Sequence, residues 1–345
     1  MWIEIIISII GISVAAKMLP QFILLSRFAY SNAKFSAVPN EYIKEKEIAR
    51  LLESKNLEDF KNNVVSRDFI LEGSNAEEIQ RSIDKSLIEI VKMAKNDSPP
   101  AVSEFYDAYL QKMDGENLKK AIKNVMEGKE IGDYVAYSEN GKILLEKLKK
   151  MEREEMEKFM EENFNISLSM PLERIEREID RIMIRGIAEV KVPKSSRKAI
   201  DKFTGIMIDV INLKTILRGK HYGKKGIEEN LLGGGWEIYE WKLEELLKID
   251  SVAEIISMLE GTSYMHYLSQ AITDYEKKGV MALERALDRY MIKAAGEIAN
   301  EYYMGVGPGI RFIVEKEYEA RNLKAVAKAI ETDMREEAWN VMVVI

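Results

Sequence analysis

Apolar and polar positions along the chain recur at helical spacing, and one such pattern occurs three times. Its centre is the tripeptide Asn-Leu-Lys at residues 117–119, 212–214 and 322–324, so successive copies are separated by 95 and 110 residues. Counted from the Asn, position −3 is acidic, +1 is Leu, +4 and +5 are apolar, and +2 and +6 are basic in every copy. A pattern of this length predicts one supersecondary unit present in three copies.

On a helix that turns ~100° per residue, the apolar positions share one arc, which we expect to pack into the core. The basic positions lie on the adjacent rim, where their stems can cover apolar surface while their charges stay in water. The acid falls inside the apolar arc, and the Asn borders it. We therefore predict a structural repeat core formed by the acid, the Asn and the Leu of each copy: Asp114, Asn117 and Leu118; Asp209, Asn212 and Leu213; Glu319, Asn322 and Leu323.

The acid inside the apolar arc has two interpretations. A buried carboxylate must be paired or protonated, because burying it alone is very costly. In the first hypothesis, each acid–Asn pair is a structural clamp between helices of one repeat. The alternative is a catalytic or ion-binding carboxylate, which would not need to occur at one position in all three copies. We expect the clamp.

A second part of the repeat precedes the long helix. Residues 51–69 are echoed at residues 246–264, since both segments contain a Leu-Leu pair, a turn with Ser and a later aromatic residue. This echo predicts short helices upstream of each Asn-Leu-Lys helix. We place three helical repeat domains at residues 28–130, 131–235 and 236–345.

The most apolar stretch is residues 2–25, and we expect residues 1–27 to form an apolar N-terminal helix that is a possible membrane anchor. A helix of this length would span a hydrocarbon core of about 30 Å. Glu4, Lys17 and Pro20 weaken the case, because the uncharged run Ile5–Ala16 is short. A helix packed on the body, or one lying in the membrane interface, is the alternative.

The charges that flank this stretch indicate an orientation. Lys17, Arg27 and Lys34 lie on its C-terminal side or near its end. By the positive-inside rule, this distribution places the main body on the cytoplasmic face of the cell membrane.

The amino-acid composition excludes several classes of function. The chain of 345 residues has a net charge of −7, which argues against nucleic acid as the main partner. It has no Cys and only two His, His221 and His266, which lie in different repeats. Disulfides, thiol chemistry and Cys-ligated metals are therefore excluded, and there is little room for a His metal site or a catalytic triad.

The glycine run Gly233–Gly235 lies close to lysines, which invites comparison with a phosphate-binding loop. However, no Gly-Lys-Ser/Thr follows a strand, so we interpret the run as a helix stop and turn. We expect no catalytic residue, no cofactor, no metal and no small-molecule substrate.

Longer strings resemble a known family. Residues 209–223, DVINLKTILRGKHYG, followed by three glycines, resemble the centre of the C subunit of archaeal A-type ATP synthases, whose family includes the vacuolar-ATPase d subunit. Gly307-Pro308 with residues 315–323, EKEYEARNL, resembles its C-terminal repeat, and residues 30–34 resemble its N-terminal opening. The resemblance covers about residues 28–345, so residues 1–27 are an extension.

The resemblance implies a funnel of three similar helical domains. In that family, the funnel sits on the proteolipid rotor ring, receives the central shaft at its other end, transmits torque between ion flow and the catalytic head, and has no active site. We therefore expect a non-catalytic central-stalk subunit of an A/V-type ATP synthase. The rival hypotheses are a membrane-tethered helical scaffold outside the ATPase, and an enzyme that uses the interior carboxylates.

Overall fold

The computed structural model describes the backbone of residues 2–345; the side chains of residues 1–15, 17, 21 and 24 lie outside the description. All regular structure in the described part is helical, which confirms the predicted all-α class. The α-helices are α1 (Trp2–Ala37), α2 (Glu45–Leu52), α3 (Leu57–Asn63), α4 (Ala76–Asp97), α5 (Ser103–Met126), α6 (Glu139–Leu148), α7 (Arg153–Phe164), α8 (Leu172–Ala188), α9 (Lys194–His221), α10 (Glu240–Leu247), α11 (Val252–Met258), α12 (Ser263–Gln270), α13 (Ile272–Lys278), α14 (Met281–Glu301), α15 (Gly307–Thr332) and α16 (Arg335–Ala338).

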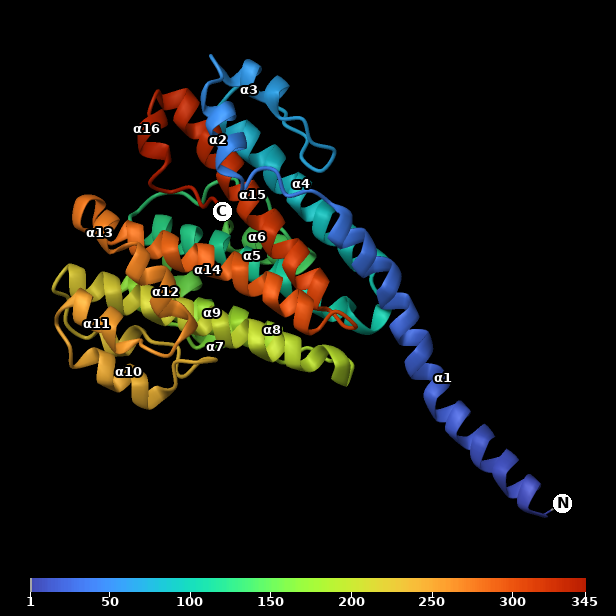
Figure 1. Ribbon diagram of the computed structural model, residues 1–345. Helices are drawn as coiled ribbons and strands as arrows, with labels where there is room; N and C mark the ends of the chain where they lie inside the picture. Colours follow the sequence, from blue (N-terminus) through green and yellow to red (C-terminus); the bar gives the residue numbers. More distant parts are fainter. Residues whose placement is uncertain (1) are drawn as a thin grey trace.

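Six long helices form three antiparallel hairpins, α4–α5, α8–α9 and α14–α15. In Figure 1 the turns of all three lie at the same end of the molecule. A proline lies at the connection of each hairpin. Pro100 lies between α4 and α5, Pro193 lies between α8 and α9, and Pro308 lies in the first helical turn of α15. Proline ends a preceding helix and is tolerated at the start of the next, so the chain reverses at these points.

The hairpins are joined into a closed circuit by packing between them. The helix that carries Asn-Leu-Lys packs along a long helix of another hairpin: α5 along α8, α9 along α14, and α15 along α4. Each predicted repeat domain contains one hairpin, although its boundaries remain a prediction. The third pairing joins the two ends of the chain, because α15 is near the C-terminus whereas α4 is near the N-terminus.

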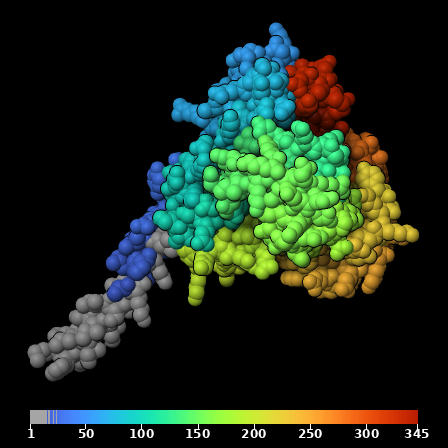
Figure 2. Space-filling model, turned by 180° about the vertical axis from the view of Figure 1, so that it is seen from behind, coloured from blue at the N-terminus to red at the C-terminus, as the bar shows by residue number. Residues whose placement is uncertain are grey.

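Short helices link the long helices along the outside. The segment of α6 and α7 covers the centre of the face seen from behind, in green in Figure 2. Polar caps fix where some of them begin: Asn56 accepts a hydrogen bond from the Asp59 amide at 2.9 Å, and Ser138 accepts one from the Gly141 amide at 2.9 Å. Such caps satisfy amides that the first helical turn leaves unpaired.

The three Asn-Leu-Lys helices converge toward the hairpin-turn end on an aromatic core. Tyr109 of α5 stacks on Phe203 of α9 with ring centroids 6.3 Å apart, and both rings are buried. On the other side of α15, Phe312 stacks on Phe35 of α1 at 4.9 Å. Away from this end, α15 and α4 diverge from α9 and α14 (Figure 1), as expected for a funnel.

The C-terminal part of α1 is tied to the hairpin-turn end of the body. Buried Asn32 donates a hydrogen bond to the Gly305 carbonyl in the α14–α15 turn at 3.2 Å, and Lys34 pairs with Asp97 at the end of α4 at 2.6 Å. The described blue part of α1 leaves the body at one edge (Figure 2). The predicted anchor falls mostly on residues whose side chains are outside the description, and no helix among the described residues is long and apolar enough to cross a membrane.

Candidate functional site

The first acid–Asn pair holds the loop that follows α5. Buried Asp114 accepts hydrogen bonds from the Tyr137 amide at 2.7 Å, from the Ser138 amide at 2.8 Å and from the Ser138 hydroxyl at 2.6 Å. Asn117, one turn later on α5, donates to the Val135 carbonyl at 2.8 Å. Burial raises the pKa of Asp114, while these donors act in the opposite direction.

The second pair makes the same kind of contact after α9. Fully buried Asp209 accepts from the amides of residues 236, 237 and 238 at 3.0, 2.7 and 3.2 Å and from the Tyr264 hydroxyl at 2.8 Å. Asn212 donates to the Gly233 carbonyl at 2.6 Å and accepts from the Leu232 amide at 2.8 Å. Burial raises the pKa of Asp209 to about 6 despite these donors.

The third pair binds segments from both ends of the chain. Glu319 accepts from the Tyr42 amide at 2.8 Å and pairs with buried Lys316 at 2.7 Å. Asn322 donates to the carbonyls of Tyr42 and Val343 at 2.8 and 2.7 Å and accepts from the Val343 amide at 2.9 Å. Tyr42 precedes α2, so a loop near the N-terminus takes the place that the following loop takes in the other two copies.

These contacts define the arrangement at the predicted repeat core. The acids and amides bind main-chain groups of loops, whereas the sequence suggested a clamp between helices. The reason is geometric: a carboxylate accepts several N–H groups at once, and a loop presents unpaired N–H groups that a helix interior does not. The Leu of each copy, Leu118, Leu213 and Leu323, is buried in the core.

A second set of acids, Asp84, Asp180 and Asp288, occupies equivalent places on α4, α8 and α14. Each pairs with the +2 Lys of the neighbouring Asn-Leu-Lys helix: Lys324 with Asp84 at 2.7 Å, Lys119 with Asp180, and Lys214 with Asp288 at 2.7 Å. The expectation that these lysine charges stay in water is therefore wrong. They point at a partner helix, because the antiparallel packing places an Asp opposite each of them.

The sequence analysis missed this second set, although it carries its own triplicated signal. The three copies share Arg, any residue, Ile or Leu, Asp, and Lys or Arg at residues 81–85, 177–181 and 285–289. The separations, 96 and 108 residues, nearly equal those of Asn-Leu-Lys. Because the two sets of spacings agree so closely, they indicate that the Asp motif and Asn-Leu-Lys belong to the same repeat.

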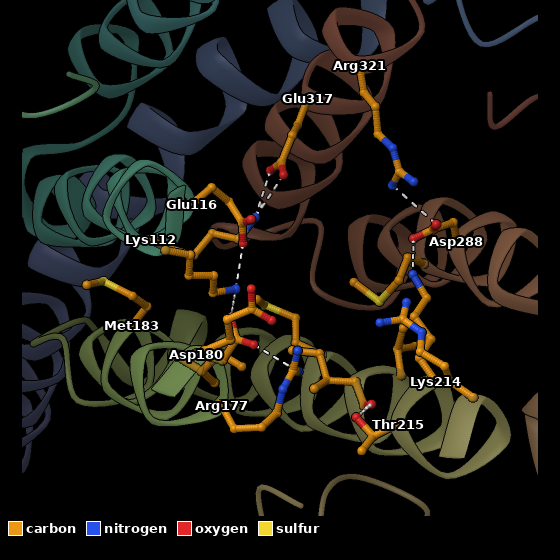
Figure 3. A pocket seen from close by; sticks show the side chains of 18 of the residues that line it. Lys112, Glu116, Arg177, Asp180, Met183, Lys214, Thr215, Asp288, Glu317 and Arg321 are labelled. Atoms are coloured by element: carbon orange, nitrogen blue, oxygen red, sulfur yellow. Dashed lines mark hydrogen bonds and ion pairs between the residues drawn. The ribbon is translucent and has the colours of Figure 1, made fainter. Parts of the chain in front are cut away.

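A cavity of about 530 Å³ lies between α5, α8, α9, α14 and α15 (Figure 3). Its walls are strongly charged. The basic lining residues are Lys112, Lys119, Lys120, Lys123, Arg177, Lys214, Arg218 and Arg321, and the acidic ones are Glu116, Glu176, Asp180, Asp288 and Glu317. Eight basic groups therefore face five acidic groups, although the whole chain carries a net charge of −7.

The acids deep in the cavity are held by cations from other helices, as Figure 3 shows for Asp288 and Glu317. Asp288 pairs with Lys214 of α9 at 2.7 Å and with Arg321 of α15 at 3.2 Å. Burial acts to raise the pKa of Asp288, but the two cations outweigh it and leave the pKa below its ordinary value. This carboxylate is therefore ionised at neutral pH and joins three helices.

The aromatic core lies next to the cavity and contacts it through Glu317. Glu317 pairs with Lys112 of α5 at 2.8 Å and accepts a hydrogen bond from the Tyr109 hydroxyl. The Tyr109 ring stacks on Phe203 beneath these charges. We call this charged cavity the socket; the Tyr109–Phe203 stack packs behind Glu317 and does not itself line it.

The acidic side chains of the described residues do not gather into a single cluster. No group of three or more His, Asp or Glu side chains among them is arranged to hold a metal ion. The three acids of the predicted repeat core do not converge on one pocket, since each binds its own loop. The fold and this cavity define a class of protein: an all-helical threefold repeat built around a central socket.

The chain belongs to the ATP synthase (C/AC39) subunit family, whose sequence pattern matches residues 31–341. It is 28% identical to the C subunit of the A-type ATP synthase of Methanothermobacter thermautotrophicus, over 93% of this chain and 89% of that protein. It is 28% identical to the equivalent protein of Methanocaldococcus jannaschii, over 88% and 83% of the two chains, and 25% identical to that of Pyrococcus abyssi, over 92% and 90%. The resemblance seen in the sequence is therefore confirmed, and the protein is a subunit of an ATP synthase complex.

Proposed function

We propose that this protein is the non-catalytic central-stalk subunit that links the membrane rotor ring of an A/V-type ATP synthase to the central shaft. It transmits torque for ion-coupled ATP synthesis or hydrolysis and has no active site of its own. The observation that carries the proposal is the closed circuit of three helical hairpins around a charged cavity of about 530 Å³.

A torque-transmitting part must deform little under load. Here, ion pairs such as Lys214–Asp288 and Lys119–Asp180 connect each Asn-Leu-Lys helix to its neighbour across the circuit. Partly buried pairs with several hydrogen bonds restrict the relative motion of the elements that they join. The circuit is also closed at the ends of the chain by Asn322, so the three hairpins support one another.

The two ends of the molecule suit different partners. The exposed lining residues Lys120 and Lys123 lie near the C-terminal end of α5, away from the hairpin turns, and we propose that the foot of the shaft enters the socket there. The hairpin-turn end, to which α1 is tied through Asn32, would sit on the proteolipid ring at the cytoplasmic face of the membrane.

Reconstitution tests the proposal. Complexes assembled with and without this protein are placed in vesicles, and ATP hydrolysis and ATP-driven ion uptake are measured separately. We expect the head to hydrolyse ATP in both cases, whereas ion uptake requires this protein. Equal uptake in its absence would contradict the proposal. Ion uptake lost together with hydrolysis would contradict the non-catalytic role.

We also propose that residues 1–27 anchor the protein beside or within the ring. The described side chains of Met18, Leu19, Phe22 and Ile23 are 62%, 59%, 70% and 44% exposed, which is unusual for large apolar residues so close together. Alkaline carbonate extraction of membranes, with the full chain and with a chain lacking residues 1–27, tests the anchor. Release of the full chain into the supernatant would rule it out.

A further inference from the structure

The exposed rim of the socket carries more basic than acidic groups. Lys120 and Lys123, near the C-terminal end of α5, line the cavity and are exposed. Among the described residues, no acid lies within ion-pair distance of Lys120, although Glu116 one turn earlier acts on it at longer range, and Lys123 has only Glu127, the residue that follows α5, at 4.0 Å. In contrast, the acids deeper in the socket are paired with cations. The exposed lining residues are the basic Lys120, Lys123, Arg218 and Arg321 and the acidic Glu116, so basic groups predominate at the opening.

Helix dipoles do not account for these lysines. The C-terminal ends of α5, α9 and α15 lie at the open end, and cations there offset the negative ends of the dipoles. However, α4, α8 and α14 run in the opposite direction, so their N-terminal ends lie at the same end of the molecule. The positive ends of these three dipoles therefore already offset the negative ends of the other three. The charge of Lys120 is thus available to a partner.

We propose that the segment of the central shaft that enters this socket ends in an acidic tip, whose carboxylates pair with Lys120 and Lys123 at the rim. This inference rests on the proposed function and specifies the chemistry of the partner. The volume of about 530 Å³ admits the side chains of a helix end but not a whole coiled coil, because a helix is about 10–12 Å across.

A protein tip fits these observations better than a small polyanion does. A small polyanion needs several unpaired cations that converge on one point. In this socket the converging cations, such as Lys214 and Arg321, are already bound to Asp288. The unpaired lysines are at the rim, where the flank of an inserted helix end would lie. Rim charges of this kind mainly control association rate and specificity.

The test measures binding of the full chain to the purified head–shaft assembly as a function of salt. The variant is Lys120→Glu with Lys123→Glu, and the matched control is Lys194→Glu with Lys198→Glu. The control makes the same change in charge on exposed lysines at the start of α9, at the opposite end of the body. We expect the rim variant to bind about tenfold or more weakly at low salt and to lose most of the salt dependence, with the control within about twofold of the wild type.

The possible outcomes separate this inference from the proposed function. If the wild type binds the shaft and the rim variant binds equally well, the acidic tip is ruled out while the proposed function stands. If the wild type does not bind the assembly, the proposed function itself fails. Saturable binding of tripolyphosphate that requires Lys120 and Lys123, without any effect of the rim variant on shaft binding, would assign the rim to a small anion and overturn the inference.

Discussion

At the scale of single residues, the buried acids act as acceptors that order the backbone of a loop. Asp209 shows this most completely, because three consecutive amides and a tyrosine hydroxyl point at one carboxylate. Its surroundings contain no cation within ion-pair distance among the described residues. Burial therefore dominates and raises its pKa to about 6.

This pKa gives the stability a defined pH dependence. A carboxyl whose pKa is raised in the folded state binds a proton more readily there than in the unfolded chain, so its contribution to stability is lost as pH rises. We expect the unfolding free energy of the wild type, relative to that of Asp209→Asn, to fall by about 3 kcal/mol between about pH 4 and pH 7. Urea unfolding at several pH values measures the difference, and a constant difference would contradict the expectation.

Glycine is required beside the same carboxylate for a steric reason. A Cβ on Gly235 would lie 2.2 Å from an Asp209 oxygen and 2.5 Å from the Gly205 carbonyl. The sequence interpretation of this glycine as part of an ordinary turn omitted this close approach. We expect Gly235→Ala to destabilise the protein by about 1–3 kcal/mol, measured by urea unfolding.

Gly186→Ala is the matched control, because no atom lies within 4 Å of its Cβ position in α8. Alanine there is expected to stabilise the helix by about 0.5–1 kcal/mol. A Gly235→Ala variant that is as stable as the wild type, or more stable, would contradict the steric role of the close approach to Asp209.

At the scale of helices, neighbouring elements are joined by one Lys–Asp pair in each copy. Asp288 has additional partners, since it also pairs with Arg321 at 3.2 Å and accepts a hydrogen bond from the Tyr318 hydroxyl at 2.7 Å. Removing one member of a buried pair leaves the opposite charge unpaired, which costs more than the pair itself contributes.

We therefore expect Asp288→Ala to destabilise the protein by about 3–5 kcal/mol, because Lys214 and Arg321 both lose their carboxylate. The control is Glu89→Ala, which removes the exposed pair with Lys92 and should change stability by less than about 1 kcal/mol. Thermal unfolding of both variants measures the effects. A small effect of Asp288→Ala would mean that the pair does not brace α9 against α14 and α15.

At the scale of the whole molecule, the circuit is closed without a covalent link. Asn322 of α15 holds Tyr42 and Val343 at once, and the Ile345 amide donates to the Ile43 carbonyl at 2.9 Å. The third unit therefore contains residues 42–43, which precede α2, as well as the C-terminal residues 343–345.

Asn322→Ala should open this closure, because it leaves two buried carbonyls and one amide without their partner. We expect a loss of about 2–5 kcal/mol and faster hydrogen exchange at residues 42–43 and 343–345. Asn117→Ala, which removes one hydrogen bond to Val135, is the control and should cost about 1 kcal/mol. Unchanged exchange at both chain ends in Asn322→Ala would contradict the closure.

The sequence by itself determined that the chain is helical and which face of each repeated helix is buried. The reason is that a buried helix face requires apolar residues at helical spacing, and this spacing is visible within a short segment of sequence. It also singled out Asp114, Asp209 and Glu319 as polar groups inside apolar faces. Tertiary structure alone decided what these groups bind. Periodicity records that a position is buried but not which distant segment covers it.

The socket was not predicted from the sequence for the same reason, because it is formed by residues that are far apart in the chain. Glu319 meets Tyr42 across 277 positions, and Lys324 meets Asp84 across 240. No local pattern encodes partners so far apart, and the cavity exists only where helices from three hairpins diverge. Whether a lysine faces water or a carboxylate therefore depended on the antiparallel packing of α5, α9 and α15 against α8, α14 and α4, because only that packing places a charge opposite each of them.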